Sequence, residues 1–324
     1  MNSNVRPPMT TSWRHVPDRT LDYFDLLSEV LLRQELSGEI SLPDLRSGPE
    51  LFLYSDYSGS HRDSRYETYC FLLVNPLSLP TWHQHRIQVR RRLLGSRRMA
   101  FKNLSDTKRA QALAPFLEAP TQLEGLVATF AISKVIPTLF PRPEAPPDNE
   151  FVQLLASWKP AVQERVLRVA SLACFLVAGL SGPAQNLYWY TDEDDIVGNR
   201  RLGEAFVKLF SHAAGHFVRD PIGRFELRTT HHDPGEQLIE DLVSVPDLVA
   251  GAITEWFSLI PRTTVGAAAT SGRQSVLPAS LSNKSRRVLQ WLGRPPTGTL
   301  RAVTYIVEPE SPVRMVWRAL TFPT

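Results

Sequence analysis

The sequence predicts an α/β protein in which helices flank a central sheet. Leu51–Tyr54 is an apolar and aromatic run that leads to Asp56, and a Ser-Gly pair then turns the chain away. Such a run is typical of a strand buried on both faces. A second run, Tyr66–Val74, follows after a short polar loop, so the two indicate an antiparallel hairpin. A later aromatic strand at Asn186–Thr191, with helical stretches between the strands, completes the α/β pattern.

The composition is that of a soluble globular protein. The chain has 324 residues, 43% of them hydrophobic and 21% charged, and this length favours one large domain or two domains. A formal charge of +3 and a pI near 8.9 do not by themselves establish nucleic-acid binding. Cys70 and Cys174 lie in apolar runs without metal-like spacing, which indicates buried thiols in a reducing compartment.

Targeting and membrane signals are weak in the sequence. The N-terminus is polar and lacks the apolar core of a secretory signal. The most apolar stretch, Val166–Leu180, contains Arg168 and is shorter than the roughly 20 residues that span a bilayer. We therefore expect a cytoplasmic protein with no membrane contact.

The spacing of apolar residues, prolines and glycines predicts the remaining elements. In the first half these are a disordered arm over 1–18, a helix over 21–36, a helix over 105–117 with Ser105 as its N-cap, a strand over 126–132, a loop over 137–147, and a helix over 151–180 broken near Pro160. In the second half they are a helix over 201–210, a strand over 225–229, a helix over 237–257 interrupted at Pro246, a loop over 262–283, a helix over 284–292, a strand over 300–307 and an apolar segment over 313–320.

Acidic residues are concentrated where predicted elements begin or end. Asp56 ends the first strand, Asp192–Asp195 is a run of four acids after a later strand, and Asp247 follows Pro246. Two-metal phosphoryl-transfer sites use carboxylates from separate elements to hold two ions about 3.5–4 Å apart. Adjacent acids also repel one another unless a cation lies between them. The sequence therefore predicts an Mg²⁺ or Mn²⁺ site formed by Asp56, Asp192, Asp195 and Asp247, with Asp194 as a further catalytic carboxylate.

Each of these acids also has a purely structural interpretation. Asp56 is placed to start a turn. The run Asp192–Asp195 suits a solvated loop that caps the next helix, and Asp247 suits the first turn of a helix that begins at Pro246. Gly251, one turn beyond Asp247, would let that helix approach a strand.

The most basic part of the chain lies between residues 86 and 109. Its candidate nucleic-acid-binding residues are Arg90, Arg91, Arg92, Arg97, Arg98 and Lys102. Whether this segment is a strand or a helix, one face is crowded with guanidinium groups, and nucleic-acid phosphate is the anion that most readily relieves such crowding. The alternative is a solvated face whose charges pair with acids elsewhere in the chain.

Other kinds of chemistry are less well supported. His212 and His216 are four residues apart, a spacing that puts both on one face of a helix, and His231-His232 follows the next strand, so a zinc site is an alternative role for these histidines. Ala213 stands where a zinc protease of the HExxH type has its glutamate. The sequence has no Walker-type phosphate loop and no GxSxG nucleophile elbow.

Several of these motifs together resemble a family of RNase H-like domains of unknown function. They are Asp56-Tyr57-Ser58-Gly59 at a strand end, the hairpin, the later strand that ends in Asp, and the helix Pro-Asp-Leu-Val-Ala-Gly-Ala-Ile over 246–253. That family opens with an Asp-Glu-Ser-Gly motif and closes with an Ala-Asp-Leu-Ile-Ala-Gly-like helix. Its members are frequent in bacterial mobile elements and phage-defence loci. The resemblance covers about residues 51–256.

The resemblance implies a mixed sheet whose first strands are antiparallel, flanked by helices. It implies an RNase H-like domain over 19–260, with an inserted helical segment over about 137–183 and a small C-terminal loop and helix/strand extension over 261–324. By position, Asp56 corresponds to the first-strand aspartate of the family, Asp192 or a neighbour to the later strand-end aspartate, and Asp247 to the helix aspartate.

The chain departs from the family pattern at two places. Tyr57 stands where the family has Glu, and the strand 126–132 ends in Ser133-Lys134 without an acid, with Glu124 before it as a substitute. Two hypotheses follow. The first is a metal-dependent nuclease that acts on DNA or RNA. The second is a catalytically degenerate module that binds nucleic acid or a partner protein.

Overall fold

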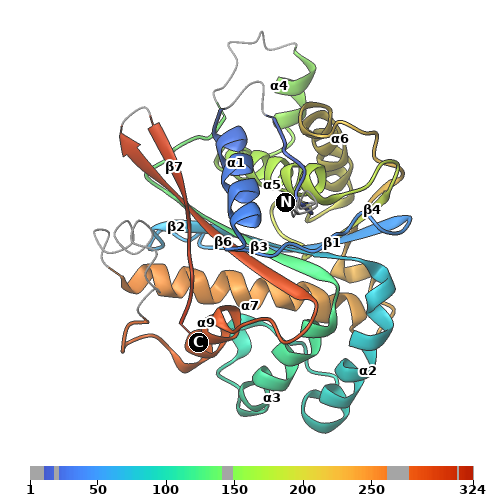
Figure 1. Cartoon of the computed structure of the whole chain (residues 1–324), viewed down its shortest axis with the longest axis vertical. Helices are drawn as coiled ribbons and strands as arrows, with labels where there is room; N and C mark the ends of the chain where they lie inside the picture. Colours follow the sequence, from blue (N-terminus) through green and yellow to red (C-terminus); the bar gives the residue numbers. More distant parts are fainter. Residues whose placement is uncertain (1–10, 18–21, 141–148, 261–276, 312–313, 324) are drawn as a thin grey trace, which may run out of the picture.

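The fold is an α/β fold built on a seven-stranded mixed sheet with the order β5-β4-β1-β2-β3-β6-β7 (Figure 1). The computed structural model describes residues 11–17, 22–140, 149–260, 277–311 and 314–323. The strands are β1 Glu50–Ser58, β2 Tyr66–Val74, β3 Gly125–Ser133, β4 Asn186–Thr191, β5 Phe225–Thr229, β6 Leu300–Ser311 and β7 Arg314–Ala319. β1 is antiparallel to β2 and β2 to β3, whereas β4 and β5 run parallel to β1. The mixed sheet with antiparallel first strands is confirmed and is consistent with an RNase H-like fold.

Helices cover both faces of the sheet (Figure 1). They are α1 Asp22–Ser37, α2 Leu79–Val89, α3 Thr107–Glu118, α4 Glu150–Leu155, α5 Pro160–Leu180, α6 Arg200–Phe217, α7 Leu238–Leu259 and α9 Asn283–Gly293. One hydrophobic core lies between the sheet and α1, α5 and α6, and a second lies between the sheet and α2, α3, α7 and α9. We call these two sides the α5 face and the α7 face.

The central strands explain why the sheet forms where the sequence predicts it. β3 is buried at every position and β2 at all but one, because both faces of these strands are covered by helices. The predicted hairpin between β1 and β2 is confirmed. Gly59 permits its turn, since it has φ +84° and a Cβ there would lie 2.2 Å from the Tyr66 carbonyl oxygen.

The helix α7 differs from the prediction. It is one continuous helix with Pro246 inside it, so Asp247 lies mid-helix rather than in a first turn. Proline removes one helix hydrogen bond, but α7 is buried against β1 and β2, and this packing outweighs the loss. α7 is long and apolar enough to cross a membrane, yet most of its apolar stretch is buried inside the molecule, as in the core helix of a soluble protein.

The start of α3 also differs in detail. The helix begins at Thr107, and its N-cap is Asp106 rather than Ser105. The Asp106 carboxylate accepts a hydrogen bond from the Arg109 backbone N–H at 3.0 Å, which is the usual role of an N-cap aspartate.

The two ends of the chain are more integrated than predicted. Within the predicted arm, residues 11–17 are packed, because the Trp13 indole is 1% exposed and lies over Gly179 of α5; residues 1–10 and 18 lie outside the described part. At the other end, β6 pairs with β3 and α9 packs on α7, so the C-terminal extension completes the same sheet. Most of the predicted loops 137–147 and 262–283 also lies outside the described residues.

Candidate functional site

Two of the predicted aspartates lie side by side where β1 and β4 approach their ends. These strands are parallel neighbours, and Ser55 is level with Thr191. Asp56 and Asp192 each come one residue later, so strand geometry places them next to each other. Because side chains alternate along a strand, Asp56 shares the α7 face with Tyr54, which belongs to the core on that side.

The third aspartate reaches this position from the helix that covers the face. α7 packs on β1 and β2, and the side chain of Asp247 shares a hydrogen bond with that of Asp56. The Phe101 backbone N–H donates to Asp247 Oδ2 at 2.6 Å. Gly251 makes room for this arrangement, since a Cβ there would lie 2.4 Å from the Phe101 ring. The sequence predicted that Gly251 allows the helix to approach a strand. In the structure, Gly251 instead allows the close approach of Phe101.

The electrostatics of the three aspartates favour uptake of a proton or a cation. Burial raises the pKa of Asp56 well above its usual value, and the negative charges of Asp247 and Asp192 raise it further. Burial also raises the pKa of Asp247, although the Phe101 N–H and the nearby Arg98 act in the opposite direction. A carboxyl pair of this kind holds a proton that a single exposed carboxylate would lose.

Arg98 provides a positive charge within the same group. Its Nη2 donates to Asp192 Oδ2 at 2.6 Å, and Thr230 Oγ1 donates to Asp192 Oδ1 at 2.8 Å. Arg98 Nε is buried and has no hydrogen-bond partner among the described residues. The sequence assigned Arg98 to nucleic-acid binding, whereas in the structure it is the ion-pair partner of a predicted metal ligand. Thr230 was missed, although its place directly after the parallel strand β5 is the kind of signal that singled out Asp56.

Asp194 and Asp195, the other predicted site residues of the acidic run, are not part of this group. Arg165 on α5 donates to Asp195 Oδ1 at 2.7 Å and pairs with Asp194 at 3.3 Å, and α5 covers the opposite face of the sheet. Asp194 also accepts the backbone N–H groups of Ile196 and Val197 in the turn. Repulsion within the acidic run is therefore relieved by Arg98 and Arg165, and not by a cation shared among all its members.

The structure shows the surroundings of the positions at which the chain departs from the family pattern. Tyr57 points away from Asp56 to the α5 face, where its hydroxyl lies 2.7 Å from Ser55 Oγ and Arg165 lies over its ring. The positions level with Asp56 on β2 and β3 are Cys70 and Thr129, so neither central strand supplies a carboxylate there. Glu124 precedes β3, at the far end of that strand, and is bonded to Asn75.

The basic segment divides into a buried part and an exposed part. Arg90 and Arg86 both donate to Asp241 Oδ2 at 2.6 Å, and Asp241 is only 1% exposed. Arg90 therefore stabilises the fold, and its buried ion pair with Asp241 counts against the role in nucleic-acid binding that the sequence predicted for it. Arg97 is partly buried and close to the Leu94 carbonyl oxygen.

Of the candidate nucleic-acid-binding residues in the basic segment, Arg91, Arg92 and Lys102 are exposed. Arg91 and Arg92 lie in the π-helix Arg90–Leu94, and Lys102 directly follows Phe101. Within the described part of the chain none of the three side chains has an ion-pair or hydrogen-bond partner, so all three can meet an anion on the α7 face.

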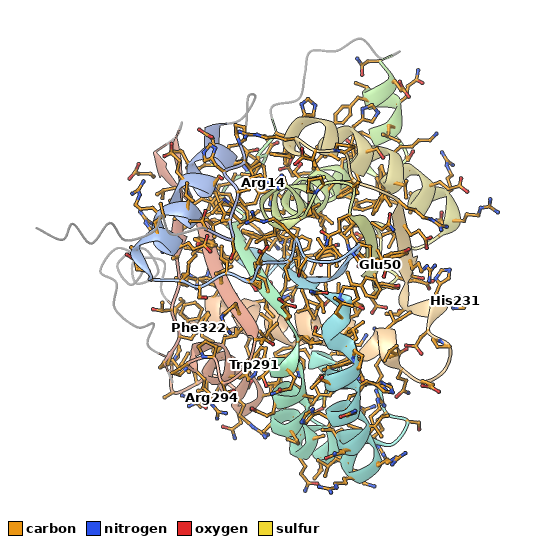
Figure 2. All side chains as sticks on the ribbon, turned by 45° about the vertical axis from the view of Figure 1, so that its right-hand side comes forward. Arg14, Glu50, His231, Trp291, Arg294 and Phe322 are labelled. Atoms are coloured by element: carbon orange, nitrogen blue, oxygen red, sulfur yellow. The ribbon has the colours of Figure 1, made fainter. Side chains whose placement is uncertain are left out.

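The histidines do not join the aspartates. His212 and His216 are exposed on α6, on the α5 face. His231, which is labelled in Figure 2, and His232 are exposed in a short 3-10 turn. His232 Nδ1 lies within 3.4 Å of Thr229 Oγ1. Among the described residues, none of these histidines belongs to a trio of ligand side chains within 4.8 Å of one another.

The three aspartates offer ligand atoms that suit a hard divalent ion, but their carboxylate oxygens do not all lie close to one another. Asp56, Asp192 and Asp247 offer only oxygen ligands, which Mg²⁺ and Mn²⁺ prefer. Within the described part of the chain, these three do not bring one oxygen each within 4.8 Å of the others. The bonded pair Asp56 and Asp247 is therefore the part of the site that fits a cation directly, and Asp192 would have to leave Arg98 to complete it.

A pH dependence of stability follows from this pair. Because the pKa of Asp56 is raised in the folded state, its stabilising contribution is complete below the unfolded value near 4 and is lost as the pH rises through the folded value. In urea denaturation without metal ions, the free energy of unfolding is expected to fall as the pH rises from about 4 through the raised folded value, with a slope approaching about 1.4 kcal/mol per pH unit for one proton. Asp56→Asn should flatten this slope, and identical pH profiles for the two proteins would refute the shared proton.

The fold and the site define an α/β protein with a seven-stranded mixed sheet, consistent with an RNase H-like fold, and with an aspartate group on one face. Comparison of the chain with family models and with curated proteins gave no match.

Proposed function

We propose that this protein is a nuclease of the RNase H-like type that uses Mg²⁺ or Mn²⁺ to hydrolyse nucleic-acid phosphodiesters. The observation that carries the proposal is the hydrogen-bonded carboxyl pair of Asp56 and Asp247 beside Asp192. Two carboxyl groups this close need a proton or a cation between them. A divalent cation would satisfy both carboxyl groups. All of its protein ligands would then be oxygen atoms, which these ions prefer.

Each residue of the site has a distinct part in this proposal. A divalent ion bound here would activate water and stabilise charge on the phosphate. Asp56 and Asp247 would hold it, and Asp192 would join them on leaving Arg98. Arg98 would then be free to donate to the phosphate oxygens, to which a guanidinium group binds in a bidentate manner. Its buried Nε, which has no partner among the described residues, would gain an acceptor in that arrangement.

The setting of the activity is also part of the proposal. The exposed Arg91, Arg92 and Lys102 would bind the backbone of DNA or RNA. Both cysteines are free and buried, which supports a reducing, cytoplasmic location. The family resemblance supports a role in bacterial phage defence or in a mobile element.

A direct assay tests the proposal. The purified protein is incubated with single- and double-stranded DNA and with RNA, in Mn²⁺, in Mg²⁺ and in EDTA. Cleavage of at least one substrate is expected with a divalent ion and not with EDTA. Failure to bind Mn²⁺ together with failure to cut any substrate would contradict the proposal.

Charge reversal on the exposed basic surface tests the nucleic-acid contact. The double variant Arg91→Glu/Arg92→Glu is expected to weaken oligonucleotide binding by at least about tenfold at 100 mM salt, and to reduce the slope of log affinity against log salt by about 1.5–2, because two phosphate contacts are lost. Fluorescence anisotropy at several KCl concentrations measures both quantities.

The matched control reverses two exposed arginines on the other face. Arg200→Glu/Arg201→Glu on α6 changes the net charge by the same amount, and this helix packs on the α5 face. Its binding should stay within about twofold of the wild type. Equal losses in the two double variants would show that net charge, and not the surface of Arg91 and Arg92, controls binding.

The second candidate function is a non-catalytic module that binds nucleic acid or a partner protein. The observation that favours it is the ion pair of Arg98 with Asp192, because Arg98 supplies from within the chain the positive charge that a cation would bring. This alternative predicts that Asp56→Ala keeps biological activity while reversal of Arg91 and Arg92 abolishes it. The opposite pattern would exclude it.

A further inference from the structure

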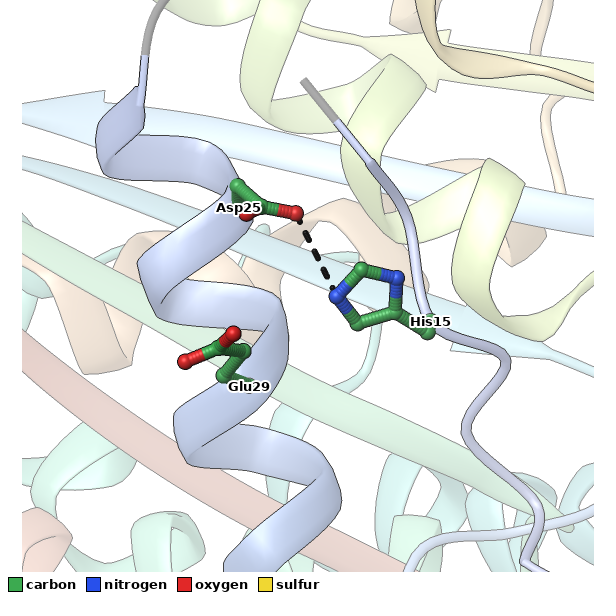
Figure 3. A group of neighbouring side chains, drawn as sticks. All are labelled: His15, Asp25 and Glu29. Carbon is green, nitrogen blue, oxygen red and sulfur yellow. Dashed lines mark ion pairs between the residues drawn. The ribbon is translucent and has the colours of Figure 1, made fainter. Parts of the chain in front are cut away.

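A second group of metal-ligand side chains lies on the α5 face, between the N-terminal segment and α1. His15 belongs to the extended segment 11–17, whereas Asp25 and Glu29 are one turn apart on α1 and face it (Figure 3). One ligand atom from each residue lies within 4.8 Å of the other two, and His15 Nε2 is 3.3 Å from Asp25 Oδ1. Among the described residues, this is the group of three His, Cys, Asp or Glu side chains that meets that spacing.

Buried contacts hold the trio in place without using its own side chains. The Trp13 indole N–H and the Val16 backbone N–H both donate to Ser28 Oγ, at 3.0 and 2.8 Å. These three anchoring residues are at most 1% exposed. The anchors lie on either side of His15 in the segment and next to Glu29 on α1, so the imidazole is fixed against the helix. Ligands positioned in advance lower the entropic cost of binding.

The charge and donor types point to a transition-metal ion. Two carboxylates face one imidazole, and Glu29 makes no ion pair or hydrogen bond with another described residue, so the group carries uncompensated negative charge. An imidazole nitrogen with two carboxylate oxygens suits Zn²⁺, whereas Mg²⁺ and Ca²⁺ prefer oxygen ligands alone. Three protein ligands leave a fourth tetrahedral position for water.

We propose that His15, Asp25 and Glu29 form a Zn²⁺ site that fastens the N-terminal segment to α1. This site is separate from the aspartate group on the α7 face and does not depend on the nuclease proposal. Bound zinc stabilises the folded state, because the ligands come together only when the segment 11–17 is packed on the helix.

Zinc titration of the full-length, metal-free protein tests the proposal. We expect calorimetry to show one Zn²⁺ bound at this site, and the melting temperature to rise by about 5 °C when zinc exceeds its Kd a hundredfold. His15→Ala and Glu29→Gln should each weaken that Kd by at least about tenfold and remove the shift. Because His15 is partly exposed and Glu29 is exposed, both variants are expected to fold. Zinc-dependent slowing of amide exchange over residues 13–17 gives a second readout in the folded protein.

Two control variants make the outcome decisive. His212→Ala/His216→Ala removes another exposed histidine pair that zinc can contact, and Asp56→Asn removes the proposed magnesium ligand; both should keep the zinc-induced shift. The proposal is overturned if the wild type binds no Zn²⁺ at micromolar concentration, if His15→Ala and Glu29→Gln keep the full shift, or if the shift disappears in either control.

Discussion

Asparagine in place of Asp56 is expected to reduce metal-dependent cleavage of nucleic acid by at least about a thousandfold, which corresponds to about 4 kcal/mol of transition-state stabilisation. The change removes the charge of one partner in the carboxyl pair and keeps its shape, so the protein should remain folded. Without metal at pH 8 it should even be more stable than the wild type, because the repulsion with Asp247 is gone. Initial cleavage rates in Mn²⁺ and urea denaturation in EDTA measure the two effects.

Asp195→Asn is the matched control for this variant. Asp195 comes from the acidic run but pairs with Arg165 of α5, which covers the other face, so its cleavage rate should stay within about twofold of the wild type. If Asp56→Asn cuts as fast as the wild type, Asp56 is not a metal ligand. If both variants lose activity equally, the loss reflects the whole acidic loop and not the pair with Asp247.

The largest effect on stability is expected at Asp241. Its carboxylate is bonded by Arg86, which is 4% exposed, and by Arg90, which is 9% exposed. Asp241→Ala leaves two buried guanidinium groups without their counter-charge, and removal of one partner from a buried ion pair typically costs about 3–5 kcal/mol. Urea denaturation at pH 7 should therefore show a lower midpoint than the wild type, and a free energy of unfolding that is lower by about this amount.

The control for Asp241→Ala is a change in a solvent-exposed ion pair on the protein surface. Glu204→Ala removes the partner of Arg200 on the surface of α6, and pairs of this kind contribute little to stability, so the unfolding midpoint should not change measurably. The buried network would lose its assigned role if Asp241→Ala were no more destabilising than Glu204→Ala. Because Arg90 also donates to the carbonyl oxygens of Gly95 and Arg97, loss of Asp241 should loosen the segment that carries Arg98.

The sequence located the strands and much of the aspartate group because both depend on local patterns. Continuous apolar runs identified β1, β2 and β3, and the position of acidic residues at the ends of two strands predicted that Asp56 and Asp192 belong to one site. Asp247 was also assigned to this group, although for a partly wrong reason. A helix start at Pro246 was expected, whereas the residue lies in the middle of α7 and reaches Asp56 because the helix packs on β1.

Charge partners far apart in the chain could not be predicted from local pattern. Arg90 looked like an exposed cation until the fold placed it on Asp241, which is 151 positions away. Asp194 and Asp195 looked like metal ligands until the fold placed them against Arg165. The packed segment 11–17 was missed for a similar reason. Its polar residues predict an arm, whereas contacts of Trp13 with α5, and of Trp13 and Val16 with Ser28 on α1, hold it against the rest of the protein.

We propose that Asp56 and Asp247 hold a divalent cation on the α7 face. Anomalous diffraction from crystals of the full-length protein grown at pH 8 in MnCl₂ tests it most directly. The account predicts a manganese peak within about 2.5 Å of a carboxylate oxygen from each of these two residues, and loss of that peak in Asp56→Asn crystals. A well-ordered pair of carboxyl groups with no manganese between them, in crystals that bind manganese elsewhere, would contradict it.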